Sequence, residues 1–134
     1  MGGARLTTLL LDTHVWAWSL TNDRRVSDRA RNEMVAAQTI LVSAISFFEI
    51  AQKVRLGKWP EMARHVDRLP TLLARQRGVP ASLEAEDCLM AGEMEWPHRD
   101  PFDRFLAASA LRRRVPIRHE PATFPRSLVQ TRLL

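Results

Sequence analysis

This chain of 134 residues contains a single cysteine, Cys88. A lone cysteine excludes a disulfide within the chain and a metal site built from several cysteines. Long apolar runs are missing as well. The early run LTTLLL, residues 6–11, is too short for a signal-peptide core and far too short to cross a bilayer. We therefore expect a cytoplasmic protein with no membrane partner.

Lysine is also rare. Of the twenty basic residues only Lys53 and Lys58 are lysines, the others are arginines, and the net charge is +5. Guanidinium groups match the geometry of phosphate oxygens, so a polyanionic partner would suit this composition. A generally arginine-rich proteome would explain it equally well, and composition does not choose between the two.

The chain length suits one domain with a single core, and we expect residues 1–134 to form that one domain. Apolar runs predict strands at residues 6–12 and 39–45, with further candidates at 81–86, 115–119 and 127–134. Helices are predicted at residues 13–20, 27–37, 46–57, 60–78 with a break near Pro70, 87–95, and from Asp100 onward. Strands alternating with helices indicate an α/β fold with a mainly parallel sheet.

Three acidic residues, Asp12, Glu49 and Asp103, fall at a strand end or in the first turn of a helix. In a parallel sheet such positions share one edge, which is where ligands bind in these folds. Clustered carboxylates repel one another unless a cation lies among them. Oxygen ligands of this kind suit Mg²⁺ or Mn²⁺, and these ions can activate water for attack on a phosphate.

Most of the acids also have a structural explanation. Glu49 follows Ser46 by three residues, a capping-box spacing, and precedes Lys53 by four, an ion-pair spacing. Asp100 stands before a proline, as an ordinary helix N-cap does. Asp12 on its own is typical of a turn after a strand. The spacing does not decide between these explanations and a functional role.

Asp103 is harder to explain by structure alone. On a helical wheel it heads the apolar stripe of Leu106, Ala107 and Ala110, so it faces the core side at the mouth of its helix. The position four residues on is an alanine, which offers no ion pair. A carboxylate that points toward the core needs a partner, and this favours a functional role.

Three segments in order, LLLDTHVWAW, SAISFFEIAQKVRLGKW and HRDPFDRFLAASAL, resemble the PIN-domain ribonucleases of the VapC toxin type. The resemblance covers nearly the whole chain. It implies a PIN-like α/β/α sandwich around a parallel sheet, cleavage of RNA that depends on Mg²⁺ or Mn²⁺, and inhibition by a cognate antitoxin. It also implies a homodimer, which the aromatic residues around Trp16 and Phe47 would favour.

Carried over residue by residue, the family's three acids fall on Asp12, Glu49 and Asp103. The resemblance implies that Asp12 and Asp103 bind the metal directly, and that Glu49 completes the site or positions the attacking water. Asp100 is then the helix cap and a candidate further ligand. We expect Arg104 to contact the RNA backbone.

The chain departs from the family pattern in one segment. Related toxins carry a T-x-D-P segment with a fourth acid, whereas this chain reads VPIRHEPATF, in which Glu120 is the best substitute ligand. The degenerate segment keeps open a second function, a non-catalytic PIN-like module that binds RNA or a protein. A metal-dependent phosphatase on a similar sheet is a third candidate.

Overall fold

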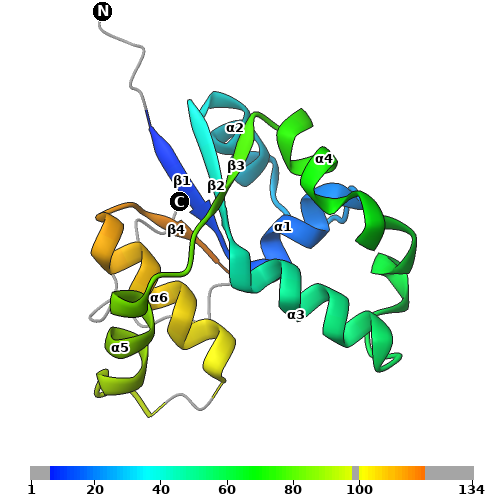
Figure 1. Cartoon of the computed structure of the whole chain (residues 1–134). Coiled ribbons are helices and arrows are strands. Elements are labelled where there is room, and N and C mark those ends of the chain that lie inside the picture. Colours follow the sequence, from blue (N-terminus) through cyan, green and yellow to red (C-terminus); the bar gives the residue numbers. More distant parts are fainter. Residues whose placement is uncertain (1–6, 98–99, 120–134) are drawn as a thin grey trace, which may run out of the picture.

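The computed structural model describes residues 7–97 and 100–119 (Figure 1). In this part of the chain the strands are β1 Thr8–Leu11, β2 Thr39–Ser43, β3 Gly78–Ala81 and β4 Ile117–Arg118. The helices are α1 Thr13–Leu20, α2 Asp28–Ala36, α3 Ala44–Arg55, the 3₁₀ segment η1 Pro60–Arg68, α4 Leu69–Arg75, α5 Ala85–Glu93 and α6 Pro101–Arg113. The predicted alternation of strands and helices is confirmed.

The described strands form one sheet in the order β3-β2-β1-β4, and every neighbouring pair is parallel. Leu10 of β1 pairs with Leu41 of β2 on one side and with Ile117 of β4 on the other. Because all strands run the same way, their carboxyl ends lie at one edge. The residues that follow β1 and β2 are therefore brought together there.

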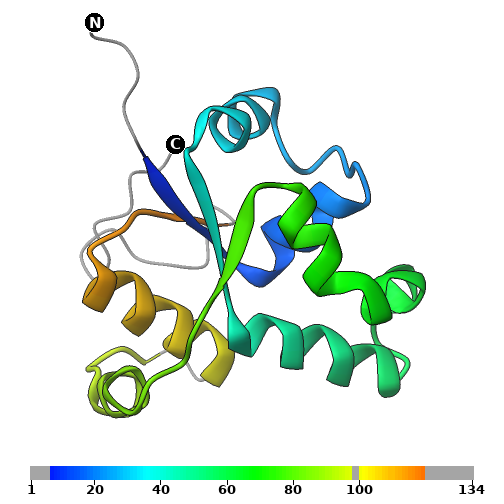
Figure 2. The same ribbon diagram turned by 45° about the horizontal axis from the view of Figure 1, so that its top comes forward.

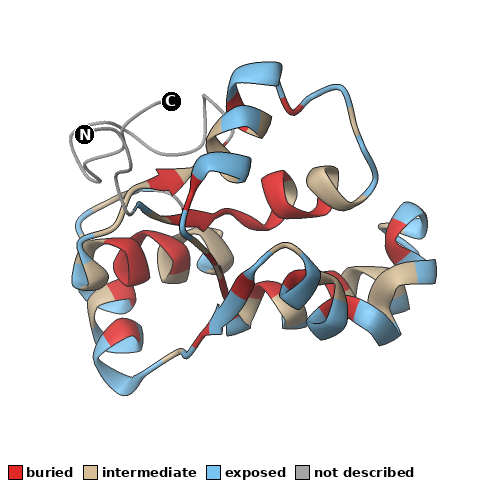
Figure 3. Ribbon diagram, turned by 90° about the horizontal axis from the view of Figure 1, so that it is seen from above, coloured by how far each residue is buried: buried red, intermediate tan, exposed pale blue. Residues whose placement is uncertain are grey.

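Side chains alternate between the two faces of the sheet. Leu9 and Leu11 of β1 belong to the larger core, which packs against α1, α3 and α4, whereas Leu10 belongs to a second core with Leu106 and Ile117. Helices α1, α2 and α4 lie on one side of the sheet, and α5 and α6 lie on the other (Figure 2). Buried residues follow the sheet and the inner helix faces (Figure 3). The predicted α/β/α sandwich is confirmed.

Two predicted element boundaries are wrong. The second strand ends at Ser43, which caps α3 by accepting a hydrogen bond from the Ile45 N–H at 3.2 Å. Ser46 therefore lies inside the helix and does not open it. The third strand is Gly78–Ala81, where the sequence predicted a strand at 81–86. Its backbone pairs with β2 despite the proline at its centre, and this pairing decides its position.

Other local predictions hold. Ser27 caps α2 through the Ala30 N–H, and Gly57, with φ of 73°, follows the end of α3. The helical region from Pro60 onward divides next to Pro70, as expected. The candidate strand at 127–134 lies outside the described residues. Within the part of the chain that is described, no helix has the length and apolar character needed to span a membrane.

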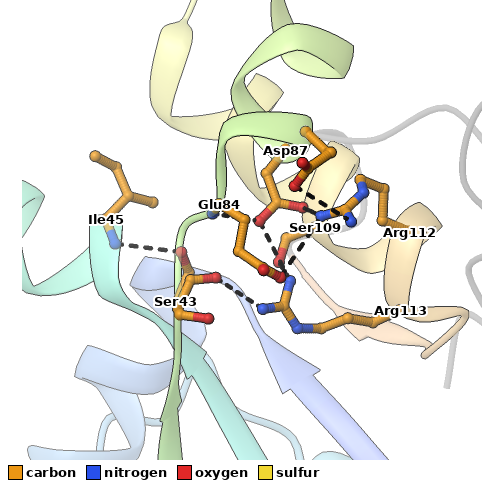
Figure 4. Close-up of polar contacts among 9 residues, drawn as sticks. Ser43, Ile45, Glu84, Asp87, Ser109, Arg112 and Arg113 are labelled. Carbon is orange, nitrogen blue, oxygen red and sulfur yellow. Dashed lines mark hydrogen bonds and ion pairs between the residues drawn. The ribbon is translucent and has the colours of Figure 1, made fainter.

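Helix α6 is held to α5 by a buried carboxylate (Figure 4). Asp87 of α5 is fully buried and accepts hydrogen bonds from Arg112 of α6 at 2.5 Å and from the Glu84 N–H at 2.8 Å. Arg113 lies 3.5 Å from its second oxygen. Burial by itself raises the pKa of Asp87, but the Glu84 N–H and Arg112 outweigh it, so the pKa is lowered. This contact fixes the orientation of α6.

Candidate active site

Asp12 lies at the carboxyl end of β1 and begins α1. Its side chain accepts a hydrogen bond from the Val15 N–H at 2.7 Å, and the residue is only 3% exposed. Its own N–H donates to the Arg118 carbonyl at the end of β4, at 3.0 Å. The ends of two adjacent strands thus converge on this carboxylate. As a buried acid at the ligand-binding edge of the sheet, Asp12 lies where the sequence placed it.

Glu49 lies on the inner face of α3, one turn and a half from the end of β2. It is 2% exposed, and one of its oxygens accepts a hydrogen bond from Lys53 Nζ at 2.6 Å. The ion-pair spacing noted in the sequence is therefore realised. The capping-box explanation is wrong, because Ser43 and not Ser46 caps this helix. A buried carboxylate paired with one ammonium retains oxygen lone pairs for a further ligand.

A hydroxyl pair joins the first turns of α1 and α3. Thr13 Oγ1 and Ser46 Oγ are 2.7 Å apart, and both residues are buried. Thr13 directly follows Asp12, and Ser46 precedes Glu49 by one helical turn. The pair therefore sets the spacing of two candidate acids. Sequence reasoning missed it, although a hydroxyl beside each acid was the available signal.

The aspartates of α6 have distinct positions. Asp100 caps the helix through the Phe102 N–H at 2.9 Å, as predicted. Asp103 is half-buried and precedes Leu106 and Ala107, both buried in the second core. The ring of Phe102 lies 6.0 Å from that of Phe48 on α3. Each phenylalanine immediately precedes a candidate acid, so this contact brings the first turn of α6 toward the Glu49 region.

Carboxylates are the donor type that a hard divalent cation prefers, so the chemistry of the predicted acids fits Mg²⁺ or Mn²⁺. Over residues 7–97 and 100–119, no three His, Cys, Asp or Glu side chains are grouped closely enough to hold a metal ion together. Glu120 lies outside the described residues. The metal-binding role of all five candidate acids therefore stays a prediction.

Arg104 makes contacts that the sequence did not predict. Its guanidinium donates hydrogen bonds to the carbonyls of Ala91, Met94 and Trp96 at 2.6 to 2.8 Å. These carbonyls belong to the end of α5 and the segment after it. The contacts give Arg104 a structural role in holding this segment against α6. An RNA-binding role for Arg104 stays a prediction.

The predicted aromatic surface around Trp16 and Phe47 belongs to the core instead. Trp16 is fully buried, its ring lies 5.0 Å from that of Phe47, and its indole N–H donates to Gln76 at 2.9 Å. Both residues pack in the larger core. Trp16 therefore offers no surface to a second subunit, whereas Phe47 is partly buried.

The parallel sheet, with helices on both faces and Asp12 buried at its carboxyl edge, defines a small α/β domain. A PIN-domain family model matches residues 9–118, which is most of the chain. The chain belongs to the PIN-domain family.

Two known proteins are similar to it. Ribonuclease VapC22 of Mycobacterium tuberculosis (strain ATCC 25618 / H37Rv) is 29% identical over 119 residues, which cover 79% of this chain and 81% of that protein. A chain in the crystal structure of VapBC2 from Rickettsia felis, bound to a DNA fragment from their promoter, superposes with a TM-score of 0.63. That match has 16% identity and covers 84% of this chain and 87% of the other, so it bears on the fold.

Proposed function

We propose that this protein is a divalent-metal-dependent endoribonuclease and the toxin of a type II toxin–antitoxin pair. The observation that carries the proposal is the buried carboxylate of Asp12, which lies at the carboxyl edge of the sheet of a PIN domain. The similarity to Ribonuclease VapC22 over most of both chains supports the same reaction.

Asp12 and Asp103 are the proposed direct metal ligands, and Glu49 completes the site or orients the attacking water. A divalent cation would supply charge for the scissile phosphate and lower the pKa of a bound water. Mg²⁺ commonly uses one or two protein carboxylates and keeps several waters, so a full protein cage is not required. Asp100 and Glu120 are proposed as helpers, the first from its cap position and the second in place of the family's fourth acid.

An assay with two substrates tests the activity. Purified protein should cleave single-stranded RNA with Mn²⁺ or Mg²⁺, lose that activity with EDTA, and leave a chromogenic phosphomonoester intact. We expect a water activated by the metal, and not a covalent nucleophile of the protein, to attack the phosphodiester. Binding of RNA without cleavage would favour the non-catalytic module, and hydrolysis of the phosphomonoester would favour the phosphatase.

An antitoxin partner is proposed by analogy with the VapBC2 assembly.

We further propose a homodimer. Trp16 and Phe47 pack in the core. The homodimer is supported by Phe48, which is 53% exposed on α3 next to Phe102. We expect light scattering at tens of micromolar, roughly the range of weak association, to give the mass of a dimer. A monomer at that concentration would contradict it, and Phe48→Ser is the variant expected to dissociate the dimer.

A further inference from the structure

The two lysines of the chain, Lys53 and Lys58, line one cleft of about 500 Å³. Its walls come from α1, from the segment after it, from the end of α3 and from η1. These elements lie beside one another at the far side of the sandwich from α5 and α6 (Figures 1 and 2). The full lining is His14, Ala17, Trp18, Thr21, Asp23, Arg25, Lys53, Lys58, Trp59, Glu61 and Met62.

The cleft lies next to one acid of the candidate active site. Helices α1 and α3 both leave the carboxyl edge of the sheet, and each carries an acid first and a cleft residue next. Asp12 is followed by His14, and Glu49 is followed one turn later by Lys53, whose ammonium it binds at 2.6 Å. The ion pair with Lys53 therefore places the cleft next to Glu49.

Aromatic rings and cations alternate along the cleft. The His14 ring stacks on that of Trp59 with centroids 4.9 Å apart, and it lies 5.8 Å from Trp18. The guanidinium of Arg25 lies over Trp18 at 4.4 Å, and Lys53 Nζ lies 5.6 Å from the Trp59 ring. The three rings are only partly buried. Such a row offers flat faces to planar groups and charges to phosphates.

Asp23 holds the arginine in this arrangement. It accepts two hydrogen bonds from the Arg25 side chain, at 3.1 and 2.8 Å, and Arg25 lowers the pKa of Asp23 to about 2. The carboxylate therefore stays charged near neutral pH and keeps the guanidinium flat against Trp18. The Arg25 side chain is 65% exposed.

We propose that this cleft is a binding subsite for single-stranded RNA, in which bases next to the cleavage position stack on Trp18–Arg25 and on Trp59 while Lys58 and Lys53 contact phosphates. The inference rests on the ribonuclease activity proposed above for the choice of RNA. Arg25 and Lys53 are each paired with a carboxylate, Asp23 and Glu49, whereas Lys58 adds an exposed cation to the lining.

Binding measured in EDTA tests the subsite without cleavage, by the fluorescence anisotropy of a labelled mixed-sequence single-stranded RNA. Trp59→Ala should weaken binding about 10-fold, because one base loses its stacking partner, and Trp59→Phe should keep most of the affinity. An abasic strand of equal length should bind the wild type and Trp59→Ala alike. Lys58→Gln should reduce the salt slope of binding by roughly 0.7, whereas Arg55→Gln, three residues earlier at the end of α3 and outside the lining, leaves the cleft unchanged.

Lysine footprinting on the unaltered protein avoids any effect of substitution on folding. RNA bound in the cleft should protect both lysines from acetylation, as read by mass spectrometry. If RNA binds and the reactivity of both lysines is unchanged, the subsite is contradicted. Protection of the same lysines by a protein partner would not alter that conclusion. If RNA is cleaved but Trp59→Ala binds RNA as tightly as the wild type does, the subsite is contradicted and the enzyme proposal stands. Protected lysines without cleavage would support the subsite and contradict the enzyme proposal.

Discussion

Replacing Asp12 with asparagine should reduce metal-dependent RNA cleavage by roughly 10²- to 10⁴-fold, the range expected when a group that acts on the reacting centre is lost. Asparagine keeps the shape and also caps helices well, so the hydrogen bond to the Val15 N–H and the start of α1 should persist. Asp103→Asn should have an effect of similar size. Initial rates of RNA cleavage with saturating Mn²⁺ measure both losses, and expression of either variant should no longer arrest growth.

Asp100→Asn is the matched control for this pair. It removes the same charge from the same helix end but keeps the cap on Phe102, so its cleavage rate should fall less than that of Asp12→Asn or Asp103→Asn. Thermal unfolding should show all three variants folded. Loss of activity in Asp100→Asn together with an active Asp103→Asn would reverse the roles assigned to these two aspartates.

Removing the carboxylate of Asp87 should lower the free energy of unfolding by about 2–3 kcal/mol. Breaking a fully buried ion pair costs roughly 3–5 kcal/mol, but both arginines are partly exposed and can regain water, which reduces the loss. The start of α5 also loses the hydrogen bond that the Glu84 N–H donates to Asp87. Urea denaturation of Asp87→Ala against the wild type measures the difference.

Glu86→Gln provides the control for this charge cluster, because Glu86 is 63% exposed and lies 3.8 Å from the same Arg112. An exposed pair of this kind contributes little, so its unfolding midpoint should barely move. An equal loss in both variants would mean that general charge balance, and not the buried contact, holds α5 to α6.

The stability from Asp87 should also depend on pH with a definite sign. Its pKa is lowered in the folded protein, so its contribution is complete above the unfolded value of about 3.9 and is lost as pH falls through the folded value. The gap in stability between wild type and Asp87→Asn should therefore be full at neutral pH and shrink below about pH 4.

Local sequence determined the helix starts and the sheet type of this protein. Ser27 and Asp100 are the caps that they were predicted to be, because a cap needs only its own side chain and an N–H two or three residues on. Apolar runs such as residues 8–11 became buried strands since nothing but the core could cover them. The sequence also predicted that the acids after these runs lie at the carboxyl edge of the sheet, because the carboxyl ends of parallel strands share one edge.

The tertiary structure alone decided what depends on partners far along the chain. Two serines could each have opened α3, and the choice fell on Ser43 because the hydroxyl of Ser46 binds Thr13, 33 residues away. Arg104 binds carbonyls 8 to 13 residues before it, contacts that the sequence did not predict. The lysines and tryptophans of the cleft likewise meet only through the packing of α1 against α3 and η1, since sequence patterns report neighbours within one element and not contacts between elements.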